Sequence, residues 1–559
     1  MHLIIVLVLV AATADPERAE AGSPSSVFEG DAEPLAQGRI DELVLGRLKQ
    51  LGITPARVCS DGVFVRRAYL DVIGTLPTAD ESRQFLQDAD RDKRRKLIDR
   101  LLDRDEFADY WAMKWCDLLR VKSEFPIKLW PNAVQAYHRW IRTGVKENLP
   151  YDRFVRELLT GSGSNFRDPQ VNFYRAVQSR EPQAIAQAVA LCFMGVRPES
   201  WPPQRWSGMA AFFSQIAYKP TVEWKEEIVL FDLDKAHSQP GLESLRAAAF
   251  PDSAPVRLAP GEDPSRAFAD WLISPKNPWF ARNVVNRVWF WLLGRGMIHP
   301  ADDIRPNNAP AEKLITYDGS PKPAGTGSET RPTGNPIGRG NNPPANPELL
   351  AFLEQDLIAA RYDLKHLYRR ILNSTTYQLS CVRRSDDPRG EANFAQYPLR
   401  PLEAEVLIDA VCQITGTTEQ YASIIPEPYT FMPENQRAVA LADASITSPF
   451  LEKFGRSSRD TGLESDRNQR PTAAQRLHLL NSSHVRRKME SSRKLRALLG
   501  SDPKRPENIV EIYLTILSRM PSDEELEIAK THVRDTWADG GPRDLFWALI
   551  NSPEFCYRH

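Results

Sequence analysis

The 559-residue chain lacks most of the motifs that would mark it as an enzyme or a metal protein. It has six cysteines, none of them in a C-x-x-C pair, and it has no H-E-x-x-H motif. A G-x-S-x-G nucleophile elbow and a Gly-Lys-Ser/Thr phosphate loop are missing as well. These absences remove the strongest sequence signals for zinc, for a serine hydrolase and for a nucleotide phosphate site. The sequence predicts no cofactor and no metal, and it leaves open whether the protein is an enzyme.

An excess of either charge is also missing. Lys and Arg number 72 and Asp and Glu 73, so the formal net charge is −1. A chain this close to neutrality has no overall field that would attract nucleic acid, and no nucleic-acid partner is predicted. Cysteine is scarce too, and its spacing specifies no disulfide pairing; Cys192 and Cys412 lie in apolar helical surroundings and are predicted to be buried.

Long apolar runs are absent after the N-terminus. The run from Leu3 to Ala12 is too short to span a bilayer and is followed by small residues, which is typical of a secretory signal. We predict a signal peptide over residues 1–21 and export to the periplasm or the extracellular space. The region before the run has no Lys or Arg. An uncleaved membrane anchor is therefore the alternative, and membrane contact is predicted only in that case.

What the chain does have is helical periodicity, with little strand-like alternation. The predicted fold is mostly α, with two helical domains at residues 38–235 and 262–559. A linker rich in Pro, Gly and Ser joins them at residues 236–261, and residues 311–347 have the composition of an exposed loop. Helix starts are predicted with Thr78 and Asn346 as N-caps.

The main candidate site is the Trp-rich helix predicted over residues 277–293 and the segment after it. Amides and guanidiniums among tryptophans cost several kcal/mol unless each finds a partner, so the helix either builds a site or fixes the architecture. We expect Asp302 and Asp303, which follow the helix, to pair back with Arg287 or Arg295. As a site, this would be a pocket for an anionic or sugar-like ligand with Asp303 as acid or base. The candidate binding residues of this region are Arg282, Asn283, Asn286, Arg287 and Arg305.

Three further groups of residues have patterns that an ordinary structural role explains. Glu403, Glu405 and Asp409 are predicted to form an exposed acidic helix face rather than an acid/base pair. The histidines at 366, 478 and 484 have no metal-ligand spacing and are predicted to be exposed or satisfied. Residues 161–164, Gly-Ser-Gly-Ser, are predicted to be a flexible turn that closes a helix.

An aromatic-rich stretch, residues 201–224, is the last candidate. Aromatic faces stack on sugars, so Trp201 and Trp206 could belong to a carbohydrate-binding surface. Trp201 stands next to two prolines and is predicted to be the exposed ring. Phe212 and Phe213 are predicted to lie in the core.

Several long, ordered motifs resemble one known family. RRAYLDVIGTLPTADESRQFL, NLPYDRFVRELLTGSGSN and the segment from Arg266 to Pro310 carry the resemblance, with RPLEAEVLIDAV and RPTAAQRLHLLNSS further on. They resemble the paired helical domains of planctomycete cytochrome-C-type secreted proteins: a domain of unknown function and a planctomycete-specific domain.

The chain departs from that family pattern at two places. Many relatives carry C-x-x-C-H-x-H-P where this chain has Cys192-Phe193-Met194-Gly195-Val196-Arg197-Pro198. Relatives often show Cys-x-Cys-x-x-Arg where this chain has Gly462-Leu463-Glu464-Ser465-Asp466-Arg467. Covalent attachment of c-type haem needs the thiol pair and the histidine. This member therefore lacks the haem site that the resemblance would imply.

Three functions remain open at this stage. The first is an exported accessory protein of the cell envelope that binds an unknown protein or glycan partner. The second is a hydrolase of polysaccharide that uses Asp302 or Asp303. The third is electron transfer without a covalent haem of its own.

Overall fold

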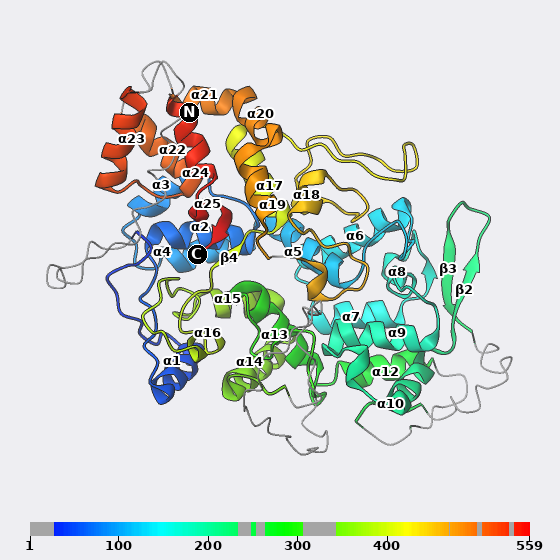
Figure 1. Cartoon of the computed structure of the whole chain (residues 1–559). Helices are drawn as coiled ribbons and strands as arrows, with labels where there is room; N and C mark the ends of the chain where they lie inside the picture. Colours follow the sequence, from blue (N-terminus) through cyan, green and yellow to red (C-terminus); the bar gives the residue numbers. More distant parts are fainter. Residues whose placement is uncertain are drawn as a thin grey trace, which may run out of the picture.

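The computed structural model of the chain describes residues 27–232, 248–252, 256, 263–305, 342–468, 470–499, 506–535 and 541–559. The predicted signal peptide, most of the linker and most of the 311–347 loop lie outside the described residues. Within these ranges helices dominate and strands are few and short, so the prediction of a mostly α fold is confirmed (Figure 1).

The helices follow one another with short connections. In the first part of the chain they are α1 (Arg39–Leu51), α2 (Asp61–Val72), α3 (Ala79–Gln87), α4 (Lys93–Leu102), α5 (Asp105–Leu118), α6 (Pro131–Lys146), α7 (Tyr151–Thr160), α8 (Asn172–Arg175), α9 (Pro182–Val189), the π-helical η3 (Ala190–Met194) and α10 (Pro203–Ala210). In the second part they are α12 (Pro264–Leu272), α13 (Phe280–Leu293), α14 (Pro347–Ala359), α15 (Leu364–Leu372), α16 (Arg389–Ala392), α17 (Ala404–Thr415), α18 (Pro449–Lys453), α19 (Ala473–Asn481), α20 (Ser483–Ser491), α21 (Arg493–Leu499), α22 (Pro506–Leu517), α23 (Asp523–Asp535), α24 (Gly541–Ile550) and α25 (Pro553–Cys556). Single 3-10 turns connect some of them; the one that matters below is η8 (Glu464–Asp466).

Both predicted N-caps are confirmed. The Thr78 side chain accepts a hydrogen bond from the Glu81 amide, and the Glu81 carboxylate accepts one from the Thr78 amide, which completes a capping box at α3. Asn346 accepts from the Leu349 amide, and Pro347 stands at the first position of α14. Proline fits there because that position has no helical partner for an amide proton.

Two small sheets complete the fold. Strands β2 (Ile216–Pro220) and β3 (Glu227–Phe231) form an antiparallel hairpin, and β1 (Gly163–Ser164) joins β3 on its other side. The second sheet pairs β4 (Arg400–Pro401) with β5 (Tyr557–Arg558). The prediction that residues 161–164 form only a turn is therefore wrong, because Gly163 and Ser164 pair with Val229 and Ile228. That pairing depends on the distant hairpin, which short-range sequence signals do not report.

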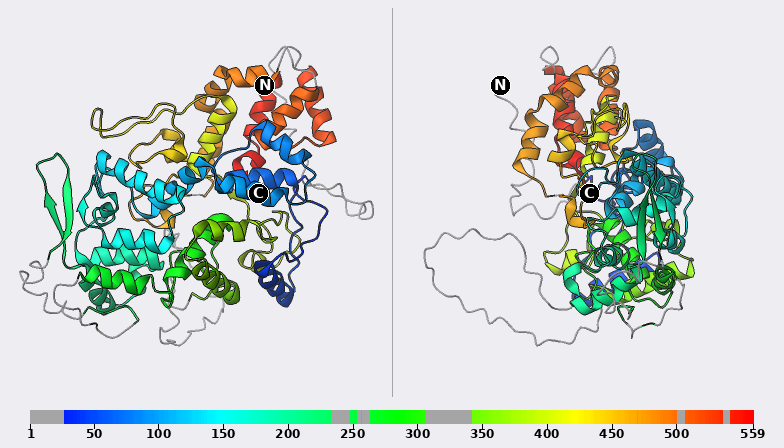
Figure 2. Two further views of the ribbon diagram at one scale, coloured as in Figure 1. Left: turned by 180° about the vertical axis from the view of Figure 1, so that it is seen from behind. Right: turned by 90° about the vertical axis from the view of Figure 1, so that its right-hand side faces the viewer.

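Helices from the two parts of the chain pack against each other and share one continuous core. Helix α3 contacts α22, α4 contacts α15, α7 contacts α12, and η3 contacts α13. Figures 1 and 2 show the blue helices α2 to α4 beside the red helices α22 to α25. The first and last described segments are thus neighbours in space. Polar groups at these contacts must find their partners across a long sequence separation.

None of the helices in the described ranges combines the length and the hydropathy that crossing a bilayer would require.

Substitution by alanine should change the stability in opposite directions at two glycines, one inside a helix and one at a helix end. Gly144 lies inside α6, where a Cβ atom would be 3.5 Å from the Phe154 ring, an ordinary contact. Gly144→Ala should raise the free energy of unfolding by about 0.5–1 kcal/mol, because alanine loses less backbone entropy on folding.

Gly294 ends α13 at φ +69°, and its Cβ would meet Arg400 at 3.2 Å. Gly294→Ala should cost about 1–2 kcal/mol for the left-handed backbone. Thermal unfolding midpoints of both variants test this, and a lower midpoint for Gly144→Ala would contradict it.

Candidate functional site

Helix α13 is buried along most of its length, with its polar side chains facing the interior. Asn283, Asn286 and Arg287 are each at most 1% exposed. Asn283 donates to the Cys192 carbonyl at 2.9 Å, and Asn286 both donates to and accepts from the Ile298 backbone. The two amides thereby tie α13 to η3 on one side and to its own following loop on the other. Arg282 is half-buried on the outer side and pairs with Glu354.

Arg287 does not pair with the aspartates that follow the helix. Its Nη1 donates to Oε1 of Glu464 at 2.7 Å, and the Trp291 indole donates to the same oxygen at 3.0 Å. Arg295 lies 3.9 Å from Glu391. The predicted pairing of Arg287 or Arg295 with Asp302 and Asp303 is therefore wrong. The partner of Arg287 comes from η8, far along the chain, where no local spacing rule could have located it.

Asp302 and Asp303 are buried and engaged elsewhere. Asp302 forms an ion pair with Arg197 through Oδ1, and its Oδ2 accepts from the Glu464 amide at 3.3 Å. Asp303 pairs with Arg305 at 2.7 Å and accepts from the Ser200 hydroxyl. Both carboxylates are bonded to neighbouring arginines, so a ligand would have to displace these partners to reach them.

The two places where the chain departs from the family pattern meet at Asp302. Arg197 belongs to the first departure and Glu464 to the second, and Asp302 bonds to both. Gly195 has φ +66°, and a Cβ there would be 2.7 Å from Oδ1 of Asn283 and 2.9 Å from Ile304. A side chain at residue 195 would thus require both neighbours to move. In this chain Asn283 and Ile304 occupy the space that a side chain at residue 195 would need.

A small polar cavity lies directly beside this junction. It measures about 300 Å³ when the solvent space at its mouth is included, its enclosed part has room for about one water molecule, and we call it the polar pocket. Helix α5 supplies one wall, Trp291 of α13 another, and the segment 457–467 the third. The lining residues are Lys114, Asp117, Leu118, Trp291, Ser457, Gly462, Leu463, Glu464 and Arg467. Two cations and two carboxylates therefore face one space, from segments far apart in sequence.

The charges of the polar pocket are held in place from behind. Arg467 donates to both oxygens of Glu405, at 2.6 and 3.0 Å, and to Oδ2 of Asp117 at 2.6 Å. Arg459 donates to the other oxygen of Asp117 at 2.9 Å. Burial opposes ionisation of Asp117, but the two guanidiniums outweigh it and lower its pKa. Asp117 is thus a permanent carboxylate at neutral pH.

Lys114 connects the polar pocket to a second buried network. Its ammonium contacts Glu403 at 2.5 Å, and Glu403 also pairs with Arg558 at 2.6 Å. Arg558 and Arg400 share Asp71, each at 3.1 Å. Burial would raise the pKa of Glu403, but Arg558 and Lys114 bring it well below its usual range. This network joins α2, α5, β4 and β5.

The acidic residues of α17 and the segment before it are not on the surface. Glu403 is 2%, Glu405 1% and Asp409 7% exposed, so the prediction of an exposed acidic face is wrong. Glu405 pairs with Arg467 and Arg456. Asp409 accepts from the amides of Ala438 and Val439. The acids look solvated in sequence because their arginine partners lie outside their own helix, from Arg437 for Asp409 to Arg558 for Glu403.

The histidines lie in two separate places. His366 contacts Asp356 at 2.7 Å, and His484 contacts Glu419 at 2.9 Å. The ring of His478 lies 5.8 Å from that of His484 and packs against Phe450. Among the described residues no three His, Cys, Asp or Glu side chains are grouped as a metal site would need.

Trp201 and Trp206 are buried, at 5% and 2% exposure, and their rings are 4.8 Å apart. The prediction that Trp201 is an exposed ring is therefore wrong. The Trp206 indole donates to the Pro198 carbonyl at 2.8 Å. Phe212 and Phe213 lie in the core as predicted. These tryptophans contribute packing rather than a surface for sugars.

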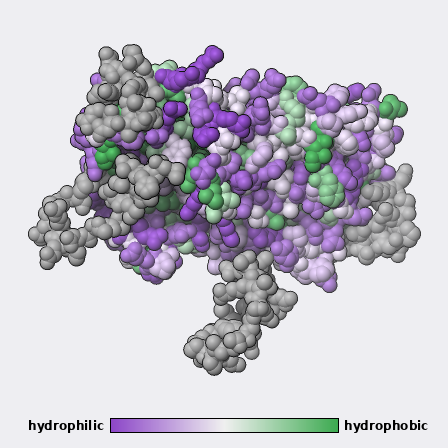
Figure 3. Space-filling view, turned by 45° about the horizontal axis from the view of Figure 1, so that its top comes forward, coloured by the Kyte–Doolittle hydropathy of each residue, from purple (hydrophilic) through white to green (hydrophobic). Residues whose placement is uncertain are grey.

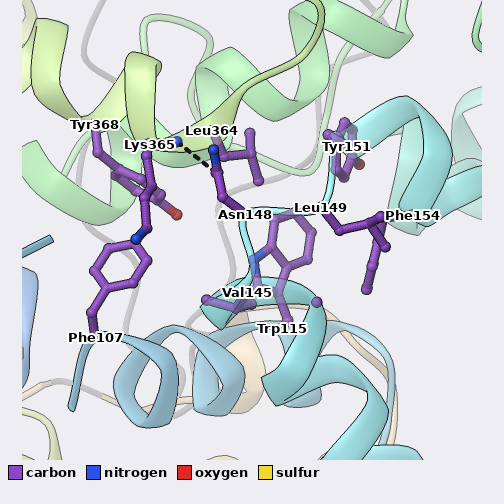
Figure 4. Close-up of a pocket in the computed structure, with 11 residues that line it drawn as sticks. Phe107, Trp115, Val145, Asn148, Leu149, Tyr151, Phe154, Leu364, Lys365 and Tyr368 are labelled. Carbon is purple, nitrogen blue, oxygen red and sulfur yellow. Dashed lines mark hydrogen bonds between the residues drawn. The ribbon is translucent and has the colours of Figure 1, made fainter. Parts of the chain in front are cut away.

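A second cavity, which we call the aromatic cavity, has five aromatic rings in its lining (Figure 4). They are Trp115, Tyr151, Phe154, Tyr368 and Phe107, and Lys365 and Asn148 stand among them. Trp115 also packs edge-on against Trp291 at 5.3 Å. The aromatic cavity and the polar pocket thus lie on either side of one tryptophan pair.

All six cysteines are free thiols in the structure. Cys192 is fully buried, as predicted, whereas Cys412 is partly exposed and 3.5 Å from the Lys488 ammonium. Burial raises the pKa of Cys412 to about 11, so its thiol stays protonated at neutral pH.

Most residues of the polar pocket were not predicted from the sequence. Lys114 and Asp117 lie in the segment RDKRRKLIDRLLDRDEFADYWAMKWCDLLR, which also resembles the family but marks neither residue as functional, and Ser457 lies in an ordinary loop. Arg467 and Glu464 did carry a signal, since they fall in the second departure from the family pattern. Only the fold shows that this departure faces α5 and α13.

The fold and the buried charge networks define a predominantly helical protein whose two parts are interlocked. Two family descriptions match it: PSCyt2, a protein of unknown function (DUF1549), over residues 39–197, and PSD1, a protein of unknown function (DUF1553), over residues 265–315 and 331–533. The chain belongs to the family with these paired planctomycete cytochrome-C-type domains. No curated protein and no solved structure matches the chain.

Asp409 predicts a pH dependence of stability. Burial raises its pKa to about 6, and Arg437 and two backbone amides offset this only in part. An acid with a raised pKa holds its proton more tightly when folded, so its contribution to stability falls as pH rises from about 4 to about 6. The expected loss is on the order of 2–3 kcal/mol.

Urea unfolding at several pH values gives the free energy of unfolding of the parent protein and of Asp409→Asn. The value for the parent minus the value for the variant should fall between pH 4 and 6, because asparagine does not titrate. Asp523→Asn, at an exposed position on α23, is the control and should show no such change. A pH-independent difference for Asp409→Asn would contradict the prediction.

Proposed function

We propose that the protein is an exported binding protein of the cell envelope whose polar pocket receives a hydroxyl group of a neutral, polyhydroxylated ligand such as a sugar. The observation that carries the proposal is the composition of the pocket lining. Lys114 and Arg467 are balanced by Asp117 and Glu464. A lining with equal numbers of cations and carboxylates offers no net attraction to an anion, but it offers both donors and acceptors to hydroxyl groups.

Glu464 is the side chain best placed to meet the ligand. Its Oε1 is occupied by Arg287 and Trp291, and no side chain or backbone group in the described ranges donates to Oε2. The side chain is 25% exposed, more than Asp117 at 18% and Arg467 at 7%. Glu464 thus keeps one free acceptor at the pocket while its other oxygen is fixed. A ligand hydroxyl could donate to that free oxygen.

The size of the pocket limits the ligand. The enclosed space has room for about one water molecule, so a sugar ring would lie at the mouth of the pocket and place one hydroxyl group inside. Trp291 supplies an aromatic surface of the kind that packs against the apolar face of a sugar. Export rests on the N-terminal signal-like segment of the sequence and on the secreted character of the resembling family.

A second candidate, a glycan hydrolase, is favoured by one observation: two carboxylates with different surroundings line the same pocket. Asp117 is held ionised by two arginines, whereas Glu464 has a free oxygen. Glycosidases use a pair of carboxyl groups beside the bond that they cleave. In this alternative the free oxygen of Glu464, rather than Asp302 or Asp303, would contact the substrate.

Binding is tested by saturation-transfer NMR with glucose, galactose, N-acetylglucosamine and glucuronate. We expect at least one neutral sugar to bind, and glucuronate to bind no more tightly. Leu463→Trp should weaken binding by roughly tenfold or more, because a larger side chain at the rim fills the space of the ligand. Leu477→Trp, at an exposed site on α19, is the matched control. Binding that is unchanged in Leu463→Trp would exclude the polar pocket.

The hydrolase alternative is tested with nitrophenyl glycosides of the same sugars. It predicts turnover that falls roughly 100-fold or more in Glu464→Gln, the effect of losing a catalytic carboxyl group. Glutamine keeps an oxygen for Arg287 and Trp291, so the thermal midpoint shows whether the fold is retained. Absence of turnover in a protein that binds sugar supports the binding protein.

A further inference from the structure

Three loops bring exposed apolar side chains to one edge of the molecule. The loop after α5 carries Phe125, the turn of the β2–β3 hairpin carries Val222 and Trp224, and the loop after α17 carries Ile424, Tyr429 and Phe431. We call these six residues the aromatic edge. Figure 1 shows the hairpin and the yellow loop after α17 projecting from the same side, and the reverse view in Figure 2 agrees.

Direct contacts show that the three loops form one surface. Trp224 on the hairpin packs against Trp130 at 5.2 Å and against Tyr429 at 5.4 Å. Glu124, next to Phe125, accepts a hydrogen bond from the Ile424 amide at 3.2 Å. The hairpin therefore touches both loops, and the loops touch each other. The aromatic edge is one contiguous feature rather than scattered side chains.

The six side chains of the aromatic edge fall into a more exposed and a less exposed group. Phe125, Val222, Ile424 and Phe431 are between 74% and 103% exposed, whereas Trp224 and Tyr429 are 51% and 55% exposed. The purely apolar side chains are thus outermost, and the amphipathic rings stand behind them. Most of the face in Figure 3 is hydrophilic or intermediate, with green limited to small spots. Several large apolar groups held together in water mark an interaction surface.

Two lysines lie against the rings of the aromatic edge. The Lys225 ammonium lies 4.2 Å from the Trp130 ring centre and 5.6 Å from that of Trp224, and Lys128 lies over Phe125. The exposed acids Glu223 and Glu427 stand on the same loops and balance these two charges. The edge therefore has no net charge that would select a charged partner.

We propose that the aromatic edge inserts into the surface of a lipid membrane. Protruding loop tips give a convex shape, which suits a soft, flat layer and provides no groove for a peptide or a sugar chain. The order of groups matches a bilayer surface: apolar tips for the acyl region, then Trp and Tyr, which favour the interface. The lysines next to the rings reach the headgroups.

This contact differs from an N-terminal anchor and is independent of the polar pocket, with which it shares no residue. It would hold the protein against the membrane while the polar pocket remains free to bind its ligand. Because the edge is electrically balanced, apolar insertion drives the contact. Zwitterionic lipid should suffice, and salt should have little effect.

The test is sedimentation of the full chain with phosphatidylcholine vesicles at low and high salt. We expect binding at both. In the double variant Ile424→Ser/Phe431→Ser the partition coefficient between vesicles and water should fall roughly tenfold or more. Each of the two original side chains removes a large apolar area from water on insertion. Both residues are exposed, so the thermal midpoint should not change.

Leu35→Ser is the matched control, because Leu35 is 74% exposed, as Phe125 is, but lies outside the three loops. All variants keep the same N-terminal segment, so any difference between them belongs to the edge. Equal binding by the double variant and the parent, or no binding by the folded parent, would overturn the proposal. The proposal would also be overturned if the parent associated with itself, or bound insoluble glycan, and the double variant did not. The aromatic edge would then be covered by a second copy or by a glycan. Binding that needs anionic lipid and disappears in salt would also overturn it.

Discussion

The structure depends on buried guanidinium groups that are neutralised by carboxylates from distant parts of the chain. Arg558 pairs with Glu403 and Asp71, and Arg467 pairs with Glu405 and Asp117. A charge of this kind left alone in the core costs several kcal/mol, so each pair fixes the relative position of the elements that carry it. The helices of the two parts have few other reasons to adopt one arrangement, because apolar packing alone tolerates many.

The local features of the fold followed from the sequence. The caps Thr78 and Asn346 were predictable because capping patterns are short-range signals. The burial of Asn283 and Arg287 followed from their position on a helix crowded with tryptophan. Their partners did not follow: Glu464 is 177 residues from Arg287. Nothing near the helix indicates that a glutamate so far along the chain, and not the adjacent Asp302, completes the pair.

The same reasoning explains why the polar pocket was missed and why its position was nevertheless indicated. A pocket formed by α5, α13 and the segment 457–467 has no sequence signature of its own. The departures from the family pattern at residues 192–198 and 462–467 could be read from the sequence, but their proximity could not. Asp302 lies between them, and Gly195 fills its place so tightly that no side chain fits there. The two departures from the family pattern are thus neighbours at a single place in the fold.

The separation of the paired charges has a consequence for how the chain acquires its structure. Asp71 and Lys114 are made early in synthesis, whereas Arg558 and Glu403, which neutralise them, are made late. Until then, any compact arrangement of the first helices would enclose charges without counterions, and it would be unstable. The first half of the chain is therefore expected to remain open during synthesis and to close in a late, cooperative step, slowed by the long loops between partners. Such a chain needs protection from aggregation for most of its time as a nascent polypeptide.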